Sequence, residues 1–309
     1  MTDSVSRRHF LGQTCGVLAG AALASQISDR ALAESEKGPI AVTCRDAHLG
    51  VAGQKDCWAA MAKLGADGVE ATIGEDLSLP GLFHPSRKYT AATPEGIEQV
   101  AADLKAANRK ITALCMYNRF DERPKFEVQW GARAAKAAQQ LGVEAIRIDV
   151  VPHKTDPSKF LSFAIVTLKK LMEATEATGV AFGIENHGGT TNNPEFLAAL
   201  FDGVGSPRLG LTLDTGNFYW YGHPLSKVHE FFETFASRVF HTHCKSIGFP
   251  ESEREKKRPM GWKYEEYTCP IDKGDIDFRR VVGILRKAGY SNDLCVEDES
   301  LGRFPTSQR

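Results

Sequence analysis

The sequence predicts an α/β fold, a (β/α)8 barrel in a single domain. Eight short apolar segments alternate with amphipathic helical segments, and polar residues gather where the apolar segments end. The chain has 309 residues, and a barrel of this kind needs about 250 residues. Since 42% of the residues are hydrophobic, we expect one domain around one large core.

The apolar segments have the composition of buried parallel strands. They are short and rich in apolar or β-branched residues, and most follow a glycine or a polar turn, as strands covered on both faces do. The predicted strands are residues 40–45, 68–73, 110–117, 145–151, 180–185, 209–214, 239–244 and 293–298.

The intervening segments have a helical period, and several end at a glycine that suits a helix C-terminus. The predicted helices are residues 56–66, 94–107, 130–142, 163–179, 194–203, 225–236 and 277–289. An open doubly wound sheet is the alternative fold. It would normally show a Gly-rich phosphate turn after its first strand, and residues 40–45 precede no such turn. The barrel is therefore favoured.

Four predicted strands end in side chains that can ligate a metal, namely Glu185, Asp214, His243 and Glu297. Each taken singly is as well explained by a helix cap or a solvated loop. However, 29 residues separate both the first pair and the second, about one strand and helix unit. Strand ends converge on one face of a barrel. The set therefore predicts a divalent metal site for Mn²⁺, Mg²⁺, Co²⁺ or Zn²⁺.

Further polar residues at predicted strand ends are candidates for orienting a substrate: Glu70, Arg147, Asp149, His187, Asn217 and Lys245. Of these, Arg147, His187, Asn217 and Lys245 are the predicted substrate-binding residues. Arg147 and Asp149 alternate on one strand, so a buried ion pair that supports the metal ligands is an equal alternative. The aromatic run at residues 218–221 can form a stacking wall for a bound ring or a plug at the barrel rim, and the plug is slightly favoured.

The N-terminal residues have the features of an export signal, in the usual order. Paired arginines and Phe-Leu occur in SRRHFLG at residues 6–12, a weakly apolar stretch covers residues 15–24, and Ala-Leu-Ala follows at residues 31–33. Together they resemble a twin-arginine export peptide. We expect residues 1–33 to be this signal, with the twin-arginine export machinery as a partner.

Residues 34–309 would then form the barrel domain, located in the periplasm or outside the cell. The apolar stretch is too short for a stable membrane span. A net charge of −1 does not favour nucleic acid as a partner. The six cysteines after residue 33 form no CxxC pair, so we expect small buried side chains rather than disulfides. An oligomer remains possible.

The motifs at the last four strands resemble those of the xylose isomerase-like TIM barrel superfamily, in particular its sugar phosphate isomerase/epimerase group. They are a Glu after the fifth strand, L-D-T-G-N after the sixth, H-x-K after the seventh and V-E-D after the eighth, and the resemblance covers residues 39–304. It implies Glu185, Asp214, His243 and Glu297 as metal ligands. His243 is preferred over His241 because H-x-K matches residues 243–245.

The resemblance implies a metal-dependent isomerase or epimerase that acts on a keto-sugar or a related polyol, with Glu185 and Glu297 as the residues that remove and return a proton. The chain departs from the group at Asn217, where ketose epimerases often have His, and at Ser246, where H-x-K-D is usual. The long segment at residues 247–270 suggests a lid whose aromatic residues close over the mouth.

Two other functions are compatible with the sequence. A metal-dependent dehydratase or lyase of a keto-sugar or keto-inositol would use the same proton abstraction, and a non-catalytic exported sugar-binding barrel would keep the fold alone. Type IV apurinic endonucleases resemble this fold, but they need further histidines that are missing around residues 270–275. An exported enzyme would meet free sugars rather than sugar phosphates.

Overall fold

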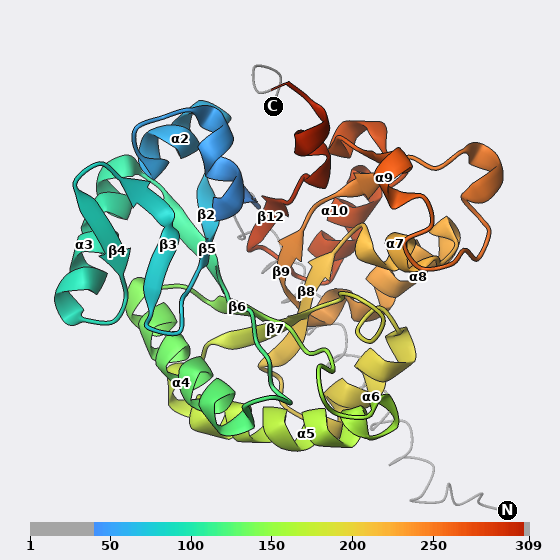
Figure 1. Ribbon diagram of the computed structural model, residues 1–309, viewed down its shortest axis with the longest axis horizontal. Coiled ribbons are helices and arrows are strands. Elements are labelled where there is room, and N and C mark those ends of the chain that lie inside the picture. The colour runs from blue at the N-terminus through green and yellow to red at the C-terminus, as the bar shows by residue number, and fades with distance from the viewer. Residues whose placement is uncertain (1–39, 306–309) are drawn as a thin grey trace, which may run out of the picture. The chain divides into compact units, whose positions relative to one another are not determined.

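The computed structural model describes residues 40–305, which contain eight parallel strands wound into a barrel (Figure 1). Around the barrel the order is β12-β1-β2-β5-β6-β7-β8-β9. The strands are β1 (Ala41–Arg45), β2 (Gly68–Thr72), β5 (Lys110–Cys115), β6 (Ala145–Ile148), β7 (Ala181–Glu185), β8 (Leu209–Asp214), β9 (Val239–His243) and β12 (Asp293–Val296). All eight predicted strands and the predicted fold class are thus confirmed.

The two ends of this sheet meet between β9 and β12. Cys244 and Val296 form an isolated parallel bridge there. The Cys244 amide donates to the Cys295 carbonyl at 2.7 Å, and the Glu297 amide donates to the Cys244 carbonyl at 3.0 Å. The last strand therefore joins the first strand on one side and the seventh on the other.

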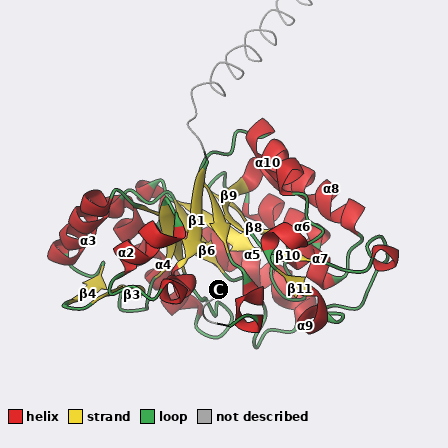
Figure 2. Ribbon diagram, turned by 90° about the horizontal axis from the view of Figure 1, so that it is seen from above, coloured by secondary structure: helices red, strands yellow, loops and turns green. Residues whose placement is uncertain are grey.

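Helices lie outside the strands (Figure 2). They are α2 (Cys57–Leu64), α3 (Pro94–Ala107), α4 (Pro124–Leu141), α5 (Pro157–Ala174), α6 (Pro194–Val204), α7 (Asn217–Tyr221), α8 (Leu225–Phe235), α9 (Tyr264–Tyr267) and α10 (Phe278–Lys287). Helices α4 and α5 begin six residues before the predicted ranges. Each starts at a proline, whose fixed φ suits the first helical position.

Two short antiparallel pairs were not predicted. The first joins β3 (Ser78–His84) to β4 (Arg87–Thr90), and the second joins β10 (Ser246–Ile247) to β11 (Thr268–Cys269). Pro80 and Gly81 interrupt the first strand and weaken its strand pattern. The second pair has only two residues in each strand, too few for a recognisable alternation.

The core lies inside the barrel and between the barrel and its helices. Phe218 and Tyr219 are fully buried there, which agrees with a plug at the rim rather than a stacking wall. The cysteines at positions 44, 57, 115, 244, 269 and 295 are all unpaired, and five of them are buried. The helices within residues 40–305 are all too short or too polar to cross a bilayer. The expected signal peptide, residues 1–33, lies outside the described residues.

Close packing between neighbouring strands leads to a stability prediction at Gly210 in β8. A methyl group there would overlap the backbone oxygen of Arg238, so we expect Gly210→Ala to lower the free energy of unfolding by about 1–3 kcal/mol. The matched control is Gly283→Ala on α10, where a methyl group meets open space and improves helix propensity. Thermal unfolding measures both, and a Gly210→Ala protein as stable as the control would contradict the packing argument.

Candidate metal centre and barrel mouth

Glu185, Asp214, His243 and Glu297 meet at the C-terminal ends of four neighbouring strands. Glu185 ends β7, Asp214 ends β8, His243 ends β9, and Glu297 directly follows β12. One ligand atom from each of the four lies within 4.8 Å of the others. All four side chains are buried. The structure thus brings together every residue of the predicted ligand set.

Hydrogen bonds and ion pairs orient the atoms that face this cluster. Asp214 accepts the amides of Gly216 and Asn217 at its Oδ1 atom, both at 2.8 Å, and its Oδ2 atom accepts no backbone amide within residues 40–305 but lies 3.0 Å from Lys245 Nζ. The Nδ1 atom of His243 has no hydrogen-bond partner there. It lies 3.4 Å from Glu185 Oε1 and 3.4 Å from Glu297 Oε2. This oxygen-rich donor set with one imidazole fits a hard or borderline divalent cation.

Hydrogen bonds also distinguish His243 from His241. The Nε2 atom of His243 lies 2.9 Å from Glu70 Oε1, an arrangement typical of a metal-binding histidine whose other nitrogen donates to a carboxylate. His241 has no such free nitrogen. Its Nδ1 atom bonds Asp293 at 3.0 Å, and its Nε2 atom bonds Glu70 at 3.2 Å. The geometry therefore favours residue 243 as the ligand.

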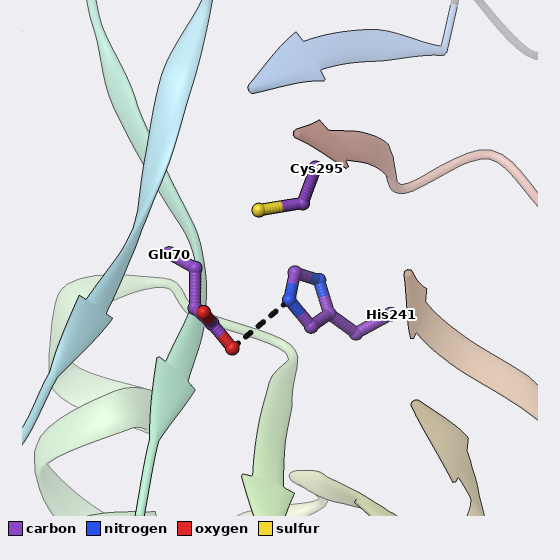
Figure 3. A group of neighbouring side chains, drawn as sticks. All are labelled: Glu70, His241 and Cys295. Atoms are coloured by element: carbon purple, nitrogen blue, oxygen red, sulfur yellow. Dashed lines mark hydrogen bonds and ion pairs between the residues drawn. The ribbon is translucent and has the colours of Figure 1, made fainter. Parts of the chain in front are cut away.

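Beneath the cluster, Glu70, His241 and Cys295 form a second group inside the barrel (Figure 3). The three side chains come from three strands and point toward one another, and the dashed line marks the bond between His241 and Glu70. All three are buried. Because Glu70 and His241 already bond to protein groups, this layer supports the ligand His243 from below.

Two arginines each hold one of the glutamates. The Arg147 guanidinium bonds Glu185 through both Nε, at 2.7 Å, and Nη2, and bonds Asp149 at 2.7 Å. Arg45 bonds Glu297 through Nη1 and Glu70 through Nε, the latter at 2.9 Å. Each glutamate is thereby left with its second oxygen directed at His243.

After Arg147 and Arg45, Lys245 is the third cationic side chain next to these carboxylates. Its Nζ atom lies 3.0 Å from Asp214, 3.4 Å from Glu297 and 2.7 Å from Glu299. Burial raises the pKa of Asp214 to about 7, although the charge of Lys245 opposes this rise. The neighbouring carboxylates of Glu297 and Glu185 add to the rise. The cationic side chains therefore do not balance all the negative charge around Asp214, which suits a site for an added cation.

The two glutamates have the opposite pKa shift. Burial alone would raise the pKa of Glu185, but the charges of Arg147 and His243 hold this pKa below its ordinary value. Glu297 is also held well below its ordinary pKa against the effect of burial, by His243 and Lys245. Both carboxylates are therefore ionised at neutral pH and able to accept a proton or a cation.

The four candidate substrate-binding residues lie in different surroundings. His187 has a half-exposed side chain at the mouth, with Nδ1 3.4 Å from Asp149. Asn217 is buried, and its Nδ2 atom donates to Glu185 at 3.3 Å. Arg147 and Lys245 are buried and already paired with carboxylates, so the alternative of a supporting ion pair is favoured for Arg147.

Several residues of the mouth were not predicted. Arg45 ends β1, so the strand-end argument used for Glu185 would have found it. Glu299 lies two residues after Glu297 and links Lys245 to the lid, because its Oε2 atom accepts the Tyr264 hydroxyl at 2.5 Å. Tyr117 falls within the predicted range of its strand, but the strand ends at Cys115, which leaves Tyr117 at the mouth.

The predicted lid, residues 247–270, has its own small aromatic core. Trp262 and Tyr267 stack with ring centroids 5.8 Å apart, and both rings contact Phe249. The buried Arg258 guanidinium lies over the ring of Phe249 and bonds backbone carbonyls within and beside the lid. Of Trp262, Tyr264 and Tyr267, Tyr264 is the one that is linked through Glu299 and Lys245 to the cluster of Glu185, Asp214, His243 and Glu297, called the metal-type cluster below.

The chain belongs to the xylose isomerase-like TIM barrel family, whose sequence pattern matches residues 58–307. A curated relative, an uncharacterized protein of Methanocaldococcus jannaschii, is 25% identical over 148 residues. That match spans 47% of this chain and 45% of the length of the relative.

Solved structures of the same fold include proteins with bound metals. A xylose isomerase-like TIM barrel protein from Mycobacterium smegmatis in complex with magnesium has a TM-score of 0.62 and 17% identity, over 84% of this chain and 90% of that one. The IOLI protein with a bound zinc atom has a TM-score of 0.61 and 17% identity, over 87% and 93%. A 3-keto-D-glucoside 4-epimerase from E. coli has a TM-score of 0.57 and 15% identity, over 84% and 92%.

Proposed function

We propose that this protein is a divalent-metal-dependent isomerase or epimerase that moves a proton at the carbon beside the carbonyl of a keto-sugar or related polyol. The observation that carries the proposal is the pair of glutamates that flank one cluster. Glu185 and Glu297 each present one oxygen 3.4 Å from His243 Nδ1, while an arginine holds the other oxygen. The isomerases and epimerases among the structures of this fold support the same kind of reaction.

In this proposal Glu185, Asp214, His243 and Glu297 hold the cation, which makes the C–H next to a carbonyl more acidic when bound. One glutamate, as the carboxylate, accepts a proton from one side of the substrate, and the other, after it has taken up a proton from water, donates that proton from the opposite side. Arg147 and Arg45 fix the two carboxylates for this transfer. Asn217 donates to the Glu185 oxygen that faces the site and so helps to orient it.

The charges around the site favour an uncharged sugar over a sugar phosphate. Arg45, Arg147 and Lys245 each pair with at least two carboxylates. A phosphate bound near these cations would have to compete with those carboxylates, at a desolvation cost that a neutral sugar does not incur.

Export is part of the proposal. We expect the pair Arg7-Arg8 to direct the chain through the twin-arginine machinery to the periplasm or beyond. Replacement of both arginines by lysine should leave uncleaved protein in the cytoplasm, as measured by cell fractionation and by mass spectrometry of the N-terminus. Normal export of that variant would rule out this route.

The contact between Glu70 and His243 generates a prediction about metal binding. We expect Glu70→Gln to lower the affinity for Mn²⁺ about ten- to a hundredfold, because the carboxylate that orients His243 is lost. Titration calorimetry on the metal-free protein measures this change. Glu127→Gln is the control, since Glu127 is equally buried but bonds Asn118 and Arg123 instead. Equal Mn²⁺ affinities in the two variants would show that Glu70 does not support the ligand.

The reaction itself is tested by deuterium exchange. The Mn²⁺-loaded protein is incubated in D₂O with a panel of keto-sugars, and NMR follows deuterium at the carbon beside the carbonyl. We expect exchange in the wild type and a loss of at least about a hundredfold in Glu185→Gln and in Glu297→Gln. Glu230→Gln on the exposed face of α8 should exchange at the wild-type rate.

Each outcome of this experiment points to one function. Exchange with loss of water indicates the dehydratase or lyase, and sugar binding without exchange indicates the non-catalytic barrel. If both glutamine variants keep their metal content and their exchange rate, the assignment of the two glutamates is wrong.

A further inference from the structure

The metal-type cluster occupies one half of the barrel mouth. Its ligands come from β7, β8, β9 and β12, which are consecutive around the barrel, and the other half is formed by β1, β2, β5 and β6. A sugar whose carbonyl lies at the cluster extends beyond the reacting carbon and oxygen atoms. Its remaining carbons and hydroxyls therefore need a surface that extends over the opposite half.

Tyr117 provides an open aromatic surface in that opposite half. It lies two residues beyond the end of β5, and 50% of its surface is exposed, although most large apolar side chains of the described chain are buried. Arg147 and Arg45 place their guanidinium groups 5.2 and 5.9 Å from the ring centroid. Arg45 also donates a hydrogen bond to the Tyr117 hydroxyl. Cation–π contacts of this kind hold a ring in place while part of it stays open.

The same two arginines connect Tyr117 to the proposed proton-transfer residues. Arg147 bonds Glu185, and Arg45 bonds Glu297. A sugar that packs against the Tyr117 ring would consequently lie next to the side chains that hold both glutamates. A tyrosine fixed in this way adds contact area at a small entropic cost, since it has few rotatable bonds.

His48 offers an unused hydrogen-bonding atom beside this half of the mouth. It lies in the 3-10 helix Asp46–Ala52 that follows β1, and its buried Nε2 atom has no hydrogen-bond partner among residues 40–305. Burial lowers the pKa of His48. The charge of Glu297 opposes this shift, and the charge of Arg45 adds to it. The ring is therefore neutral at neutral pH and able to form one further hydrogen bond. Leaving such an atom unpaired is costly.

We propose that Tyr117 and His48 form a sugar-binding subsite that receives the non-reacting end of the substrate. Tyr117 packs against the C–H face of the sugar, and His48 Nε2 hydrogen-bonds a hydroxyl group. An aromatic wall with few polar groups is the usual composition of a small-molecule site. The subsite rests on the proposed function for its ligand class, a neutral keto-sugar, and it selects the substrate without taking part in proton transfer.

The test measures sugar binding separately from catalysis. The Mn²⁺-loaded full chain is titrated by NMR saturation transfer with D-fructose, D-tagatose, D-sorbose and D-psicose. We expect Tyr117→Ala and His48→Leu each to weaken binding of the best-bound sugar about tenfold, equivalent to about 1.4 kcal/mol, and Tyr117→Phe to bind nearly as well as the wild type because it keeps the ring. Val166→Ala removes another exposed apolar side chain, 54% exposed on α5, and should change nothing.

Unfolding temperatures and Mn²⁺ affinities of the variants are measured alongside, so that a folding or metal defect is recognised. Wild-type sugar binding by both Tyr117→Ala and His48→Leu would overturn the subsite and leave the proposed reaction intact. Loss of binding in these variants, without deuterium exchange in the wild type, would uphold the subsite and overturn the reaction. If none of the four sugars binds to the wild type, the subsite is wrong.

Discussion

The pairing of buried carboxylates with buried cations is the constraint on which the mouth of this barrel depends. Glu70, Glu185, Asp214 and Glu297 are all almost inaccessible to water, and an ionised carboxylate in such a place is very unfavourable unless it is paired and hydrogen-bonded. Each cation is shared between carboxylates from different strands. Arg45, for example, joins Glu70 to Glu297. The charges therefore fix the strand ends relative to one another as well as the ligand atoms.

This pairing also determines which atoms remain available for chemistry. An arginine takes one oxygen of each glutamate, backbone amides take one oxygen of Asp214, and Glu70 takes one nitrogen of His243. One atom from each of the four residues is directed at a common point, with Lys245 and Asn217 as its neighbours. The specific arrangement of this site thus results from what the surrounding groups have already bound.

Much of the fold could be predicted from the sequence, because parallel strands covered on both faces are continuous apolar runs. That Glu185, Asp214, His243 and Glu297 lie together could be predicted for a related reason: each lies at the end of such a run. The short strands β3, β4, β10 and β11 could not, since Pro80 and Gly81 interrupt one and the second pair is too short for a pattern. The contacts within the site could not be predicted from the sequence either. Arg45 and Glu297 are 252 residues apart, and His48 is recognised as unpaired only when its neighbours in space are known.

The join between β9 and β12 has a consequence for how the protein is made. Glu297 follows the last strand, and that strand is held in place by the first strand and by the Cys244 backbone. During synthesis on the ribosome, a chain that ends before residue 297 would possess three of the four candidate ligands but not the complete set. If the cluster binds a metal as proposed, tight retention of that metal would begin only after β12 and Glu297 have emerged and docked.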